Sequence, residues 1–466
     1  RNGMSFSNAH SSSSVCTPTR YSILTGRYNW RTRLADGVLW GYSQPLIKPD
    51  EMTVGRLLQA QGYATACIGK WHFGMDWTLK EGGLADTETD KDPWSVDYTK
   101  PITNGPTTRG FDYFFGISGS LDMFPFVYIE NDHLVGIPTV DKKVFRTGPA
   151  EKDFEGVDVL PKLVEKSIAY IDEQAKDREK PFFLYLPLPA PHTPIVPTPE
   201  WQGKSGINAY ADFVMQVDDS VGQVIEALKR NGVLENTLIV FTTDNGCSPQ
   251  ANFKELAEHG HDPSYEYRGH KADIFEGGHR VPYIVQWPGH VEGGEVSDQP
   301  VCQSDLMATV AELVEVKLDT DAGVDSFSML SVLTNAKRKT SLRKYTVHHS
   351  INGSFAISQG DWKLALCPDS GGWSEPRPGK DDVSSLLPVQ LYNLAADIGE
   401  TNNLASAHPK KVARLTALLQ DYVDRGRSTP GSRQINDRAI DILAHTGKAV
   451  KKIKATPRRN PASPKA

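Results

Sequence analysis

Short apolar runs alternate with amphipathic helical patterns along the first two thirds of the chain. The apolar runs span Tyr63–Gly69, Phe182–Pro187, Leu238–Thr243 and Val281–Trp287. Runs of this length, each followed by a polar or glycine-rich turn, are typical of buried parallel strands. The helical patterns span Thr53–Gln61, Asp158–Lys176, Ala209–Arg230 and Ser304–Val314. This alternation predicts an α/β fold built on a doubly wound, mostly parallel sheet with helices on both faces.

The pattern changes beyond about Lys337, where short strand-like segments are separated by turns. These segments span Tyr345–His349, Ser354–Ser358, Asp361–Cys367 and Gln390–Leu394, and an amphipathic helix follows over His408–Arg425. Such an arrangement is typical of a small antiparallel α+β unit. We therefore expect a catalytic α/β domain over residues 1–336, a C-terminal α+β domain over 337–430 and a basic, proline-containing tail over 431–466.

Composition and charge restrict the class of protein. Hydrophobic residues make up 39% of the 466 residues, enough for a large core, so global disorder is excluded. No apolar run approaches the ~20 residues of a membrane helix, so we expect no membrane span. The net charge is −6, and Gly447–Ala466 contains seven Lys or Arg and no acid, which leaves −13 elsewhere. An acidic body argues against nucleic acid as a partner.

Cysteine usage gives no disulfide framework and no zinc motif. The five cysteines are odd in number and include no CxxC pair, so at least one thiol is not in a disulfide within the chain. Cys16 stands out because four serines precede it and Pro18 and Arg20 follow. A lone cysteine is most often a buried thiol. This polar, cationic setting instead favours a reactive side chain at a helix N-terminus.

Three further segments place polar side chains directly after predicted strands. Lys70 and His72 lie in Gly-Lys-Trp-His, His192 lies between prolines, and Asp244-Asn245 ends the strand Leu238–Thr243. Ligands gather at the carboxyl ends of strands in open α/β sheets, and two adjacent oxygen side chains suit a divalent cation. Taken alone, each segment also fits a structural explanation: a packed Trp-His pair, a satisfied histidine, or an Asn-Gly turn.

Together these motifs resemble the formylglycine-dependent sulfatases. The resemblance rests on Cys-x-Pro-x-Arg at Cys16, the Leu-Thr-Gly-Arg that begins eight residues after it, Gly-Lys-Trp-His, Pro-His-Thr-Pro, Asp-Asn-Gly, and the stretch from Lys271 to Pro282. It implies an alkaline-phosphatase-like fold and hydrolysis of sulfate monoesters, with a sulfated sugar or an aryl sulfate as substrate. It also implies that a separate maturation enzyme converts Cys16 to formylglycine, and that the protein is periplasmic or secreted.

The resemblance also implies residue roles. Asp244 and Asn245 would hold calcium or magnesium, and Arg20 and Lys70 would steady the formylglycine hydrate. His192 and Lys271 would bind sulfate and protonate the departing oxygen, and His72 would take a second proton. The family's Asp-Asp metal-ligand pair does not precede Cys16, and because the first ten residues resemble the stretch just before the signature, we expect the pair in a preceding segment.

Two alternatives and one specificity hypothesis remain open at this point. A phosphomonoester or phosphonate hydrolase of the same superfamily can share the signature, and a sulfated-glycan binding protein without turnover is possible if the chain starts at Arg1. In the C-terminal domain, His348, His349 and Trp373 are candidates for contact with a sugar. The acidic segments Asp86–Asp92 and Asp319–Asp325 lack the glycine and glutamate positions of a calcium loop and are expected to be solvated.

Overall fold

Three parallel strands form the centre of the first sheet in a computed structural model of the chain, which describes residues 2–87, 92–335 and 343–447. β3 (Ala64–Lys70) pairs in parallel with β4 (Tyr113–Ile117) on one side and with β9 (Phe182–Tyr185) on the other. β5 (Tyr128–Glu130) and β6 (His133–Val135) extend the sheet antiparallel beyond β4. Every residue of β3 is buried, and successive side chains enter hydrophobic clusters on opposite faces. A continuous apolar run suits such a strand.

The second sheet has the order β10-β11-β1-β12 and corrects one expectation. β10 (Ile239–Thr242) and β11 (Tyr283–Gln286) were expected in parallel pairing, yet they are antiparallel. A parallel return needs a long crossover. Here the connection over residues 243–282 is long enough for a crossover, but it holds only short helices, η6 (Pro249–Ala251), α5 (Phe253–Glu258) and α6 (Glu276–His279), and the chain returns at the end of the sheet where it left. The α/β fold itself is as predicted.

Small strands complete this region and the adjoining hairpin. β1 (Met4–Phe6) pairs with β11 and with β12 (Val296–Ser297), while β2 (Ala9–His10) pairs with β13 (Val301–Cys302). β7 (Val140–Lys143) and β8 (Thr147–Ala150) form a separate antiparallel hairpin. Pairing of β1 and β2 with strands almost 300 residues away ties the beginning of the described chain to its middle.

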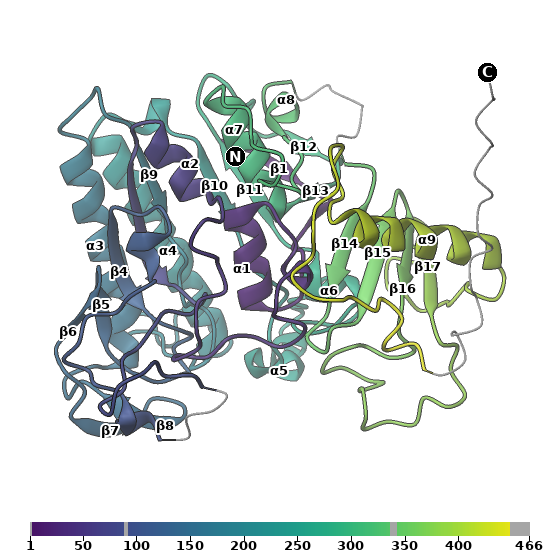
Figure 1. The fold of residues 1–466 in the computed structure, drawn as a ribbon, viewed down its shortest axis with the longest axis horizontal. Helices are drawn as coiled ribbons and strands as arrows, with labels where there is room; N and C mark the ends of the chain where they lie inside the picture. The colour runs from purple at the N-terminus through teal and green to yellow at the C-terminus, as the bar shows by residue number, and fades with distance from the viewer. Residues whose placement is uncertain (1, 88–91, 336–342, 448–466) are drawn as a thin grey trace, which may run out of the picture.

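Helices cover the sheets as their periodicity predicts. α3 (Val159–Gln174) and α4 (Ala209–Arg230) pack on each other beside β9, and Asn208 caps α4 by accepting a hydrogen bond from the Ala211 amide. α2 (Val54–Ala60) packs on α7 (Leu306–Leu313), and α8 (Leu330–Leu333) follows. Figure 1 shows α1 (Cys16–Thr25) between the β3 sheet and the C-terminal region.

The C-terminal region is a four-stranded antiparallel sheet with one long helix. The strands are β14 (Thr346–His349), β15 (Phe355–Gln359), β16 (Trp362–Ala365) and β17 (Gln390–Asn393). α9 (Pro409–Arg425) packs Leu415 and Leu419 against the sheet. Ile442 joins this core and is 3% exposed, so the described part of the expected tail packs on the body. Residues 448–466, which hold most of the basic tail, lie outside the described residues.

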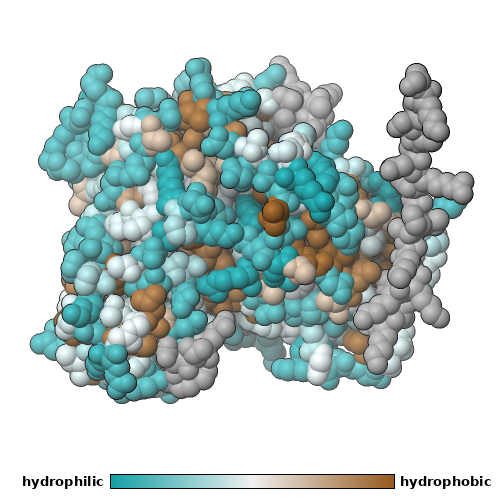
Figure 2. Space-filling model, viewed as in Figure 1, coloured by the Kyte–Doolittle hydropathy of each residue, from teal (hydrophilic) through white to brown (hydrophobic). Residues whose placement is uncertain are grey.

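No helix in the described ranges is both long and apolar enough to cross a membrane. The face shown in Figure 2 is mostly hydrophilic, with hydrophobic residues in small scattered groups. All five cysteines are free, and four of them are buried.

A fully buried ion pair holds distant segments of the chain together. The Nε and Nη2 atoms of Arg31 each donate a 2.8 Å hydrogen bond to the Asp325 carboxylate, and both side chains are inaccessible to solvent. The same carboxylate accepts from the backbone amides of Tyr28 and Ser428. Asp325 therefore joins the segment after α1, the loop after α7 and the segment after α9.

We predict that Asp325→Ala lowers the free energy of unfolding by about 3 to 5 kcal/mol, because it leaves the Arg31 charge buried without its oppositely charged partner. Urea denaturation measures the change. The control is Asp172→Ala, which breaks the exposed ion pair with Arg230 and should change stability by less than about 1 kcal/mol. Equal effects of the two substitutions would contradict the importance of burial.

Candidate active site

Cys16 is the first residue of α1 and is only 3% exposed. The sequence favoured a reactive setting over burial, and the structure has both. Burial by itself raises the pKa of the Cys16 thiol, but the positive charges of Lys70 and Lys271 outweigh it, and the pKa lies below its ordinary value. A buried cysteine whose ionised form is favoured is suited to chemistry and not to packing alone.

Two lysines and a histidine form a hydrogen-bonded chain beside Cys16. Lys70, at the end of β3, donates to the Ser120 hydroxyl at 3.2 Å. The Ser120 oxygen lies 3.3 Å from Nδ1 of His192, and the Lys271 ammonium lies 2.7 Å from Nε2 of the same ring. The structure thus brings together Lys70, His192 and Lys271, which are separated by up to 201 positions in the sequence.

The partners of His192 define its tautomer. Nδ1 lies 2.8 Å from the Thr193 carbonyl oxygen, which can only accept, so Nδ1 carries the proton. Nε2 then accepts a hydrogen bond from the Lys271 ammonium. Burial, with the charges of Lys271 and Lys70, lowers the pKa of His192 to about 4. A neutral ring can pass a proton from Lys271 to a neighbouring oxygen without adding another positive charge.

His72 is held in an unusual backbone conformation. Its φ of 60° lies in the left-handed region, which non-glycine residues rarely adopt. Its Nε2 donates to the Leu39 carbonyl oxygen at 2.7 Å, while the buried Nδ1 has no partner among the described residues. Burial lowers its pKa well below the ordinary value. His72 therefore offers an unused ring nitrogen that can accept a proton.

Asp244 and Asn245 follow β10 and lie beside α1. Arg20 donates to the Asp244 carboxylate at 2.8 Å. Burial raises the pKa of Asp244, but Arg20, Lys70 and Lys271 outweigh it and hold the pKa well below its usual value, so the carboxylate is ionised. The side-chain oxygen of Asn245 is buried without a described partner. An ionised carboxylate beside an unsatisfied amide oxygen fits a hard divalent cation.

The Lys271 loop is fixed from two sides. The Lys271 amide donates to the Cys247 carbonyl, and the Ala272 amide donates to the Ser14 carbonyl, just before Cys16. The Asp273 carboxylate accepts from the Trp373 amide at 2.7 Å. Trp373 is 40% exposed and remains a candidate for contact with substrate.

His348 and His349 do not have the placement expected of sugar ligands. Both are buried, at 0% and 1% exposure, because β14 packs against the serine run before α1. The backbone oxygen of His349 accepts from the Ser13 hydroxyl at 2.8 Å and from the Ser14 amide at 3.0 Å. The expectation that these two rings reach a sugar is therefore wrong. The sequence of β14 alone did not show that the serine run before α1 covers this strand.

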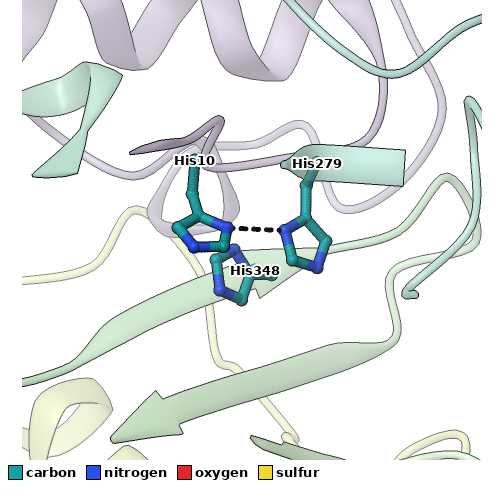
Figure 3. Close-up of side chains that lie close together, drawn as sticks. All are labelled: His10, His279 and His348. Carbon is teal, nitrogen blue, oxygen red and sulfur yellow. Dashed lines mark hydrogen bonds between the residues drawn. The ribbon is translucent and has the colours of Figure 1, made fainter. Parts of the chain in front are cut away.

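His348 instead belongs to a buried histidine trio with His10 and His279 (Figure 3). The rings of His279 and His348 stack with centroids 3.7 Å apart and planes 10° apart. Nδ1 of His10 lies 3.1 Å from Nδ1 of His279. The trio joins β2, α6 and β14, and three histidines from different elements raise the question of a metal.

Hydrogen bonding shows that the trio does not fit a metal ion. The Lys363 ammonium lies 2.9 Å from Nε2 of His279, and His10 Nε2 lies 2.8 Å from the Asn8 side-chain oxygen. Nε2 of His279 also lies 3.2 Å from the Ile274 carbonyl oxygen, but the closer Lys363 ammonium can only donate, so this nitrogen accepts from Lys363. His279 then donates to His10, and His10 donates to Asn8. No lone pair of His10 or His279 is left, and stacked rings direct their nitrogens along parallel planes. The trio is a polar contact between elements.

Sequence reasoning missed Ser120 and Asp273. Ser120 lies three residues beyond the end of β4, so it occupies the same edge as Lys70 and follows the strand-end rule. It was missed because the aromatic run Tyr113–Ile117 was not recognised as a strand. Asp273 has no comparable signal, because its function depends on a loop 100 residues away.

Comparison with known proteins agrees with this geometry. A family model described as Sulfatase matches residues 1–316. An N-acetylgalactosamine-6-O-sulfatase of Bacteroides thetaiotaomicron is 32% identical, with 91% of this chain and 86% of that protein covered. Human arylsulfatase A is 29% identical over 96% of this chain and 86% of its own length.

Solved structures give the same picture of the fold. A Bacteroides thetaiotaomicron protein described in connection with glycosaminoglycan metabolism superposes with a TM-score of 0.77 at 30% identity, covering 90% of this chain and 92% of that one. A phosphonate monoester hydrolase from Silicibacter pomeroyi superposes at 0.56 with 18% identity over 94% and 93% of the two chains. The latter likeness shows the fold alone.

The buried neutral histidines predict a loss of stability in acid. Burial lowers the pKa of His10 to about 4, so the unfolded chain takes up a proton below about pH 6.5 while the folded protein takes it up only near pH 4. The stability contribution is complete above pH 6.5 and is lost as the pH falls toward 4. Urea titrations should give a free energy of unfolding on the order of 3 kcal/mol smaller at the lower limit.

His10→Gln should make this pH dependence shallower, because the variant no longer takes up that proton on unfolding. The control is His133→Gln, a histidine whose side chain is 68% exposed, and which should leave the dependence unchanged. The same slope in both variants would contradict a contribution from His10.

Proposed function

Because this chain belongs to the sulfatase family, and is thus a sulfuric ester hydrolase, we propose that it removes a 6-sulfate from an N-acetylgalactosamine-type sugar in a sulfated glycan. Two relatives support the choice of sugar: the bacterial N-acetylgalactosamine-6-O-sulfatase and a mouse N-acetylgalactosamine-6-sulfatase, 25% identical over 93% of this chain. The observation that carries the proposal is the buried Cys16 at the start of α1, close to the charges of Lys70 and Lys271.

The proposed nucleophile is a formylglycine made from Cys16 by a maturation enzyme. Sulfatases generally use a formylglycine and a metal ion. A hydrated aldehyde supplies one hydroxyl that attacks sulfur and a second whose deprotonation releases the sulfate. The position fits this group because Cys16 begins α1, where backbone amides point toward an anion, and because lysines flank it.

Lys70, Lys271 and Arg20 provide the charge that binds a sulfuryl group and stabilises its transition state. A sulfate monoester is an anion, and charge held in place away from water stabilises it more strongly than solvated charge does. Hydrogen bonds orient Lys70 through Ser120 and Lys271 through His192, so neither ammonium has to reorganise when the ester enters. In this proposal the two lysines hold sulfate oxygens.

Two histidines move protons in this proposal. Lys271 and His192 together protonate the leaving oxygen in this proposal, which is supported by the hydrogen bond that Nε2 of His192 accepts from the Lys271 ammonium. His72 accepts a proton at its unused Nδ1. General acid–base transfer by positioned side chains of this kind contributes typically about 10² to 10⁴ in rate.

Asp244 and Asn245 are the proposed ligands of a calcium or magnesium ion. Bound there, the cation would polarise a sulfate oxygen and acidify the attacking hydroxyl. Arg20 holds one oxygen of Asp244 and keeps the carboxylate oriented, and Asn245 contributes the unsatisfied amide oxygen.

We predict that Cys16→Ala reduces sulfate release by at least about 10³ while the thermal unfolding curve is kept, because the change removes the nucleophile. Ion chromatography measures the sulfate, and mass spectrometry of the tryptic peptide reports replacement of the thiol by an aldehyde. The control is Cys367→Ala, a buried thiol of the C-terminal sheet that should keep turnover. Full activity of the Cys16 variant would refute the proposal.

The metal ligands give a separate prediction. Dialysis of the wild-type protein against a chelator should abolish turnover, and added calcium or magnesium should restore it. Asp244→Ala should lower both the bound metal, measured by elemental analysis, and the turnover. Full activity after verified removal of metal would show that the reaction does not need the cation.

A further inference from the structure

An exposed aromatic ring directly follows a residue that is hydrogen-bonded to the candidate site. Trp40 is 38% exposed and directly follows Leu39. The Leu39 amide donates to the Thr17 hydroxyl at 3.2 Å, and its carbonyl accepts from His72. These two hydrogen bonds, to Thr17 and from His72, fix the backbone of Leu39. They therefore also restrict the backbone of the adjacent Trp40.

A buried carboxylate lies close to the hydrogen-bonded chain of Lys70, Ser120 and His192. Asp122 is two residues beyond Ser120 and is 7% exposed. One carboxylate oxygen accepts from Arg146, whereas Oδ1 is buried and has no partner among the described residues. Burial raises the pKa of Asp122, but hydrogen bonds from Arg146 and Ser120 and the charge of Lys70 outweigh it, so the group is ionised. A buried ionised oxygen without a donor is incomplete.

Arg146 joins these two side chains. It comes from the turn between β7 and β8, and its guanidinium lies 4.9 Å from the centre of the Trp40 ring. Nη1 donates to the Asp122 carboxylate and, at 3.0 Å, to the Asp122 backbone oxygen. Arg146 thus fixes the positions of Trp40 and Asp122, which come from loops more than 80 residues apart.

We propose that Trp40 and Asp122 form a subsite for the sugar that bears the scissile sulfate, with Arg146 as a positioning residue; this rests on the proposed function. The exposed part of the Trp40 ring packs on the apolar face of a pyranose, and Asp122 Oδ1 accepts a hydrogen bond from a ring hydroxyl. A few well-placed polar groups on an aromatic wall are typical of small-molecule sites.

The subsite also has a consequence for selectivity. A carboxylate accepts from a hydroxyl but repels a sulfate at the same ring position. A site built to bond a hydroxyl discriminates strongly against an analogue that lacks it. The subsite therefore selects a sugar whose hydroxyl near Asp122 is free, even where the ring carries sulfate elsewhere.

Calorimetric binding to the full chain in a Cys16→Ala background separates the subsite from turnover. The probes are N-acetylgalactosamine 6-sulfate and inorganic sulfate. Trp40→Ala, Asp122→Asn and Arg146→Ala should each weaken binding of the sugar sulfate about tenfold or more, the loss of one good hydrogen bond or stacking contact. Binding of inorganic sulfate should change less than about twofold, since it ends at the sulfate pocket.

The matched control is Asp172→Ala, which breaks an exposed aspartate–arginine pair between α3 and the end of α4 and should affect neither probe. Equal weakening for both probes would assign the three residues to the pocket architecture and overturn the subsite. The subsite would also be overturned if the substitutions weakened binding of neither probe. The same holds if the Cys16→Ala protein bound the sugar sulfate no better than inorganic sulfate. Failure of mature wild-type protein to release sulfate from this sugar, with the binding split intact, would instead refute only the proposed function.

Discussion

Positive charge confined around one small side chain is the constraint on which the rest of this structure depends. Lys70, Lys271 and Arg20 are gathered near Cys16, Arg20 is paired with the Asp244 carboxylate, and each of the three cations is largely removed from water. Like charges at such distances repel, and burial adds a desolvation penalty for each. The pocket therefore reaches electrostatic balance only with an anion inside it.

Backbone hydrogen bonds help to hold these cations in place, in addition to the ionised carboxylates of Asp244 and Asp122. Lys70 is fixed where its amide donates to the Pro187 carbonyl, at a point where a side chain on Gly69 would lie 2.3 Å from that oxygen. His192 is kept neutral, which avoids a further charge between the lysines. The three cations come from different elements: Lys70 ends β3, Arg20 lies on α1 and Lys271 lies in the loop before α6.

Most of the regular structure was accessible from sequence, because periodicity reflects which side is buried. α4 occupies the predicted range Ala209–Arg230, and β3 is displaced from its prediction by one residue at each end. Strand direction was less accessible: the antiparallel pairing of β10 and β11 depends on the loop between them, which carries Lys271. Burial of His348 and His349 depends on the serine run at the other end of the chain, and no local pattern reports such a contact.

The residues of the candidate site also fall into two groups, those that the local sequence predicts and those that it does not. Residues in short motifs were identified because their chemistry and spacing are local, as for Cys16 and Arg20 on one helix face. Ser120, Asp122 and Asp273 act through neighbours that only folding brings close, and their sequence surroundings are unremarkable. Long-range hydrogen bonding is thus the part of this site that composition and spacing do not encode.

The hydrogen bonds from Ser13 and Ser14 to the His349 carbonyl oxygen restrict how such a protein can evolve. Because β14 is hydrogen-bonded to the segment that leads into α1, the C-terminal sheet is not an independent module that can be exchanged by recombination. Exchange of the C-terminal sheet would have to preserve the position of the His349 carbonyl oxygen relative to Ser13 and Ser14.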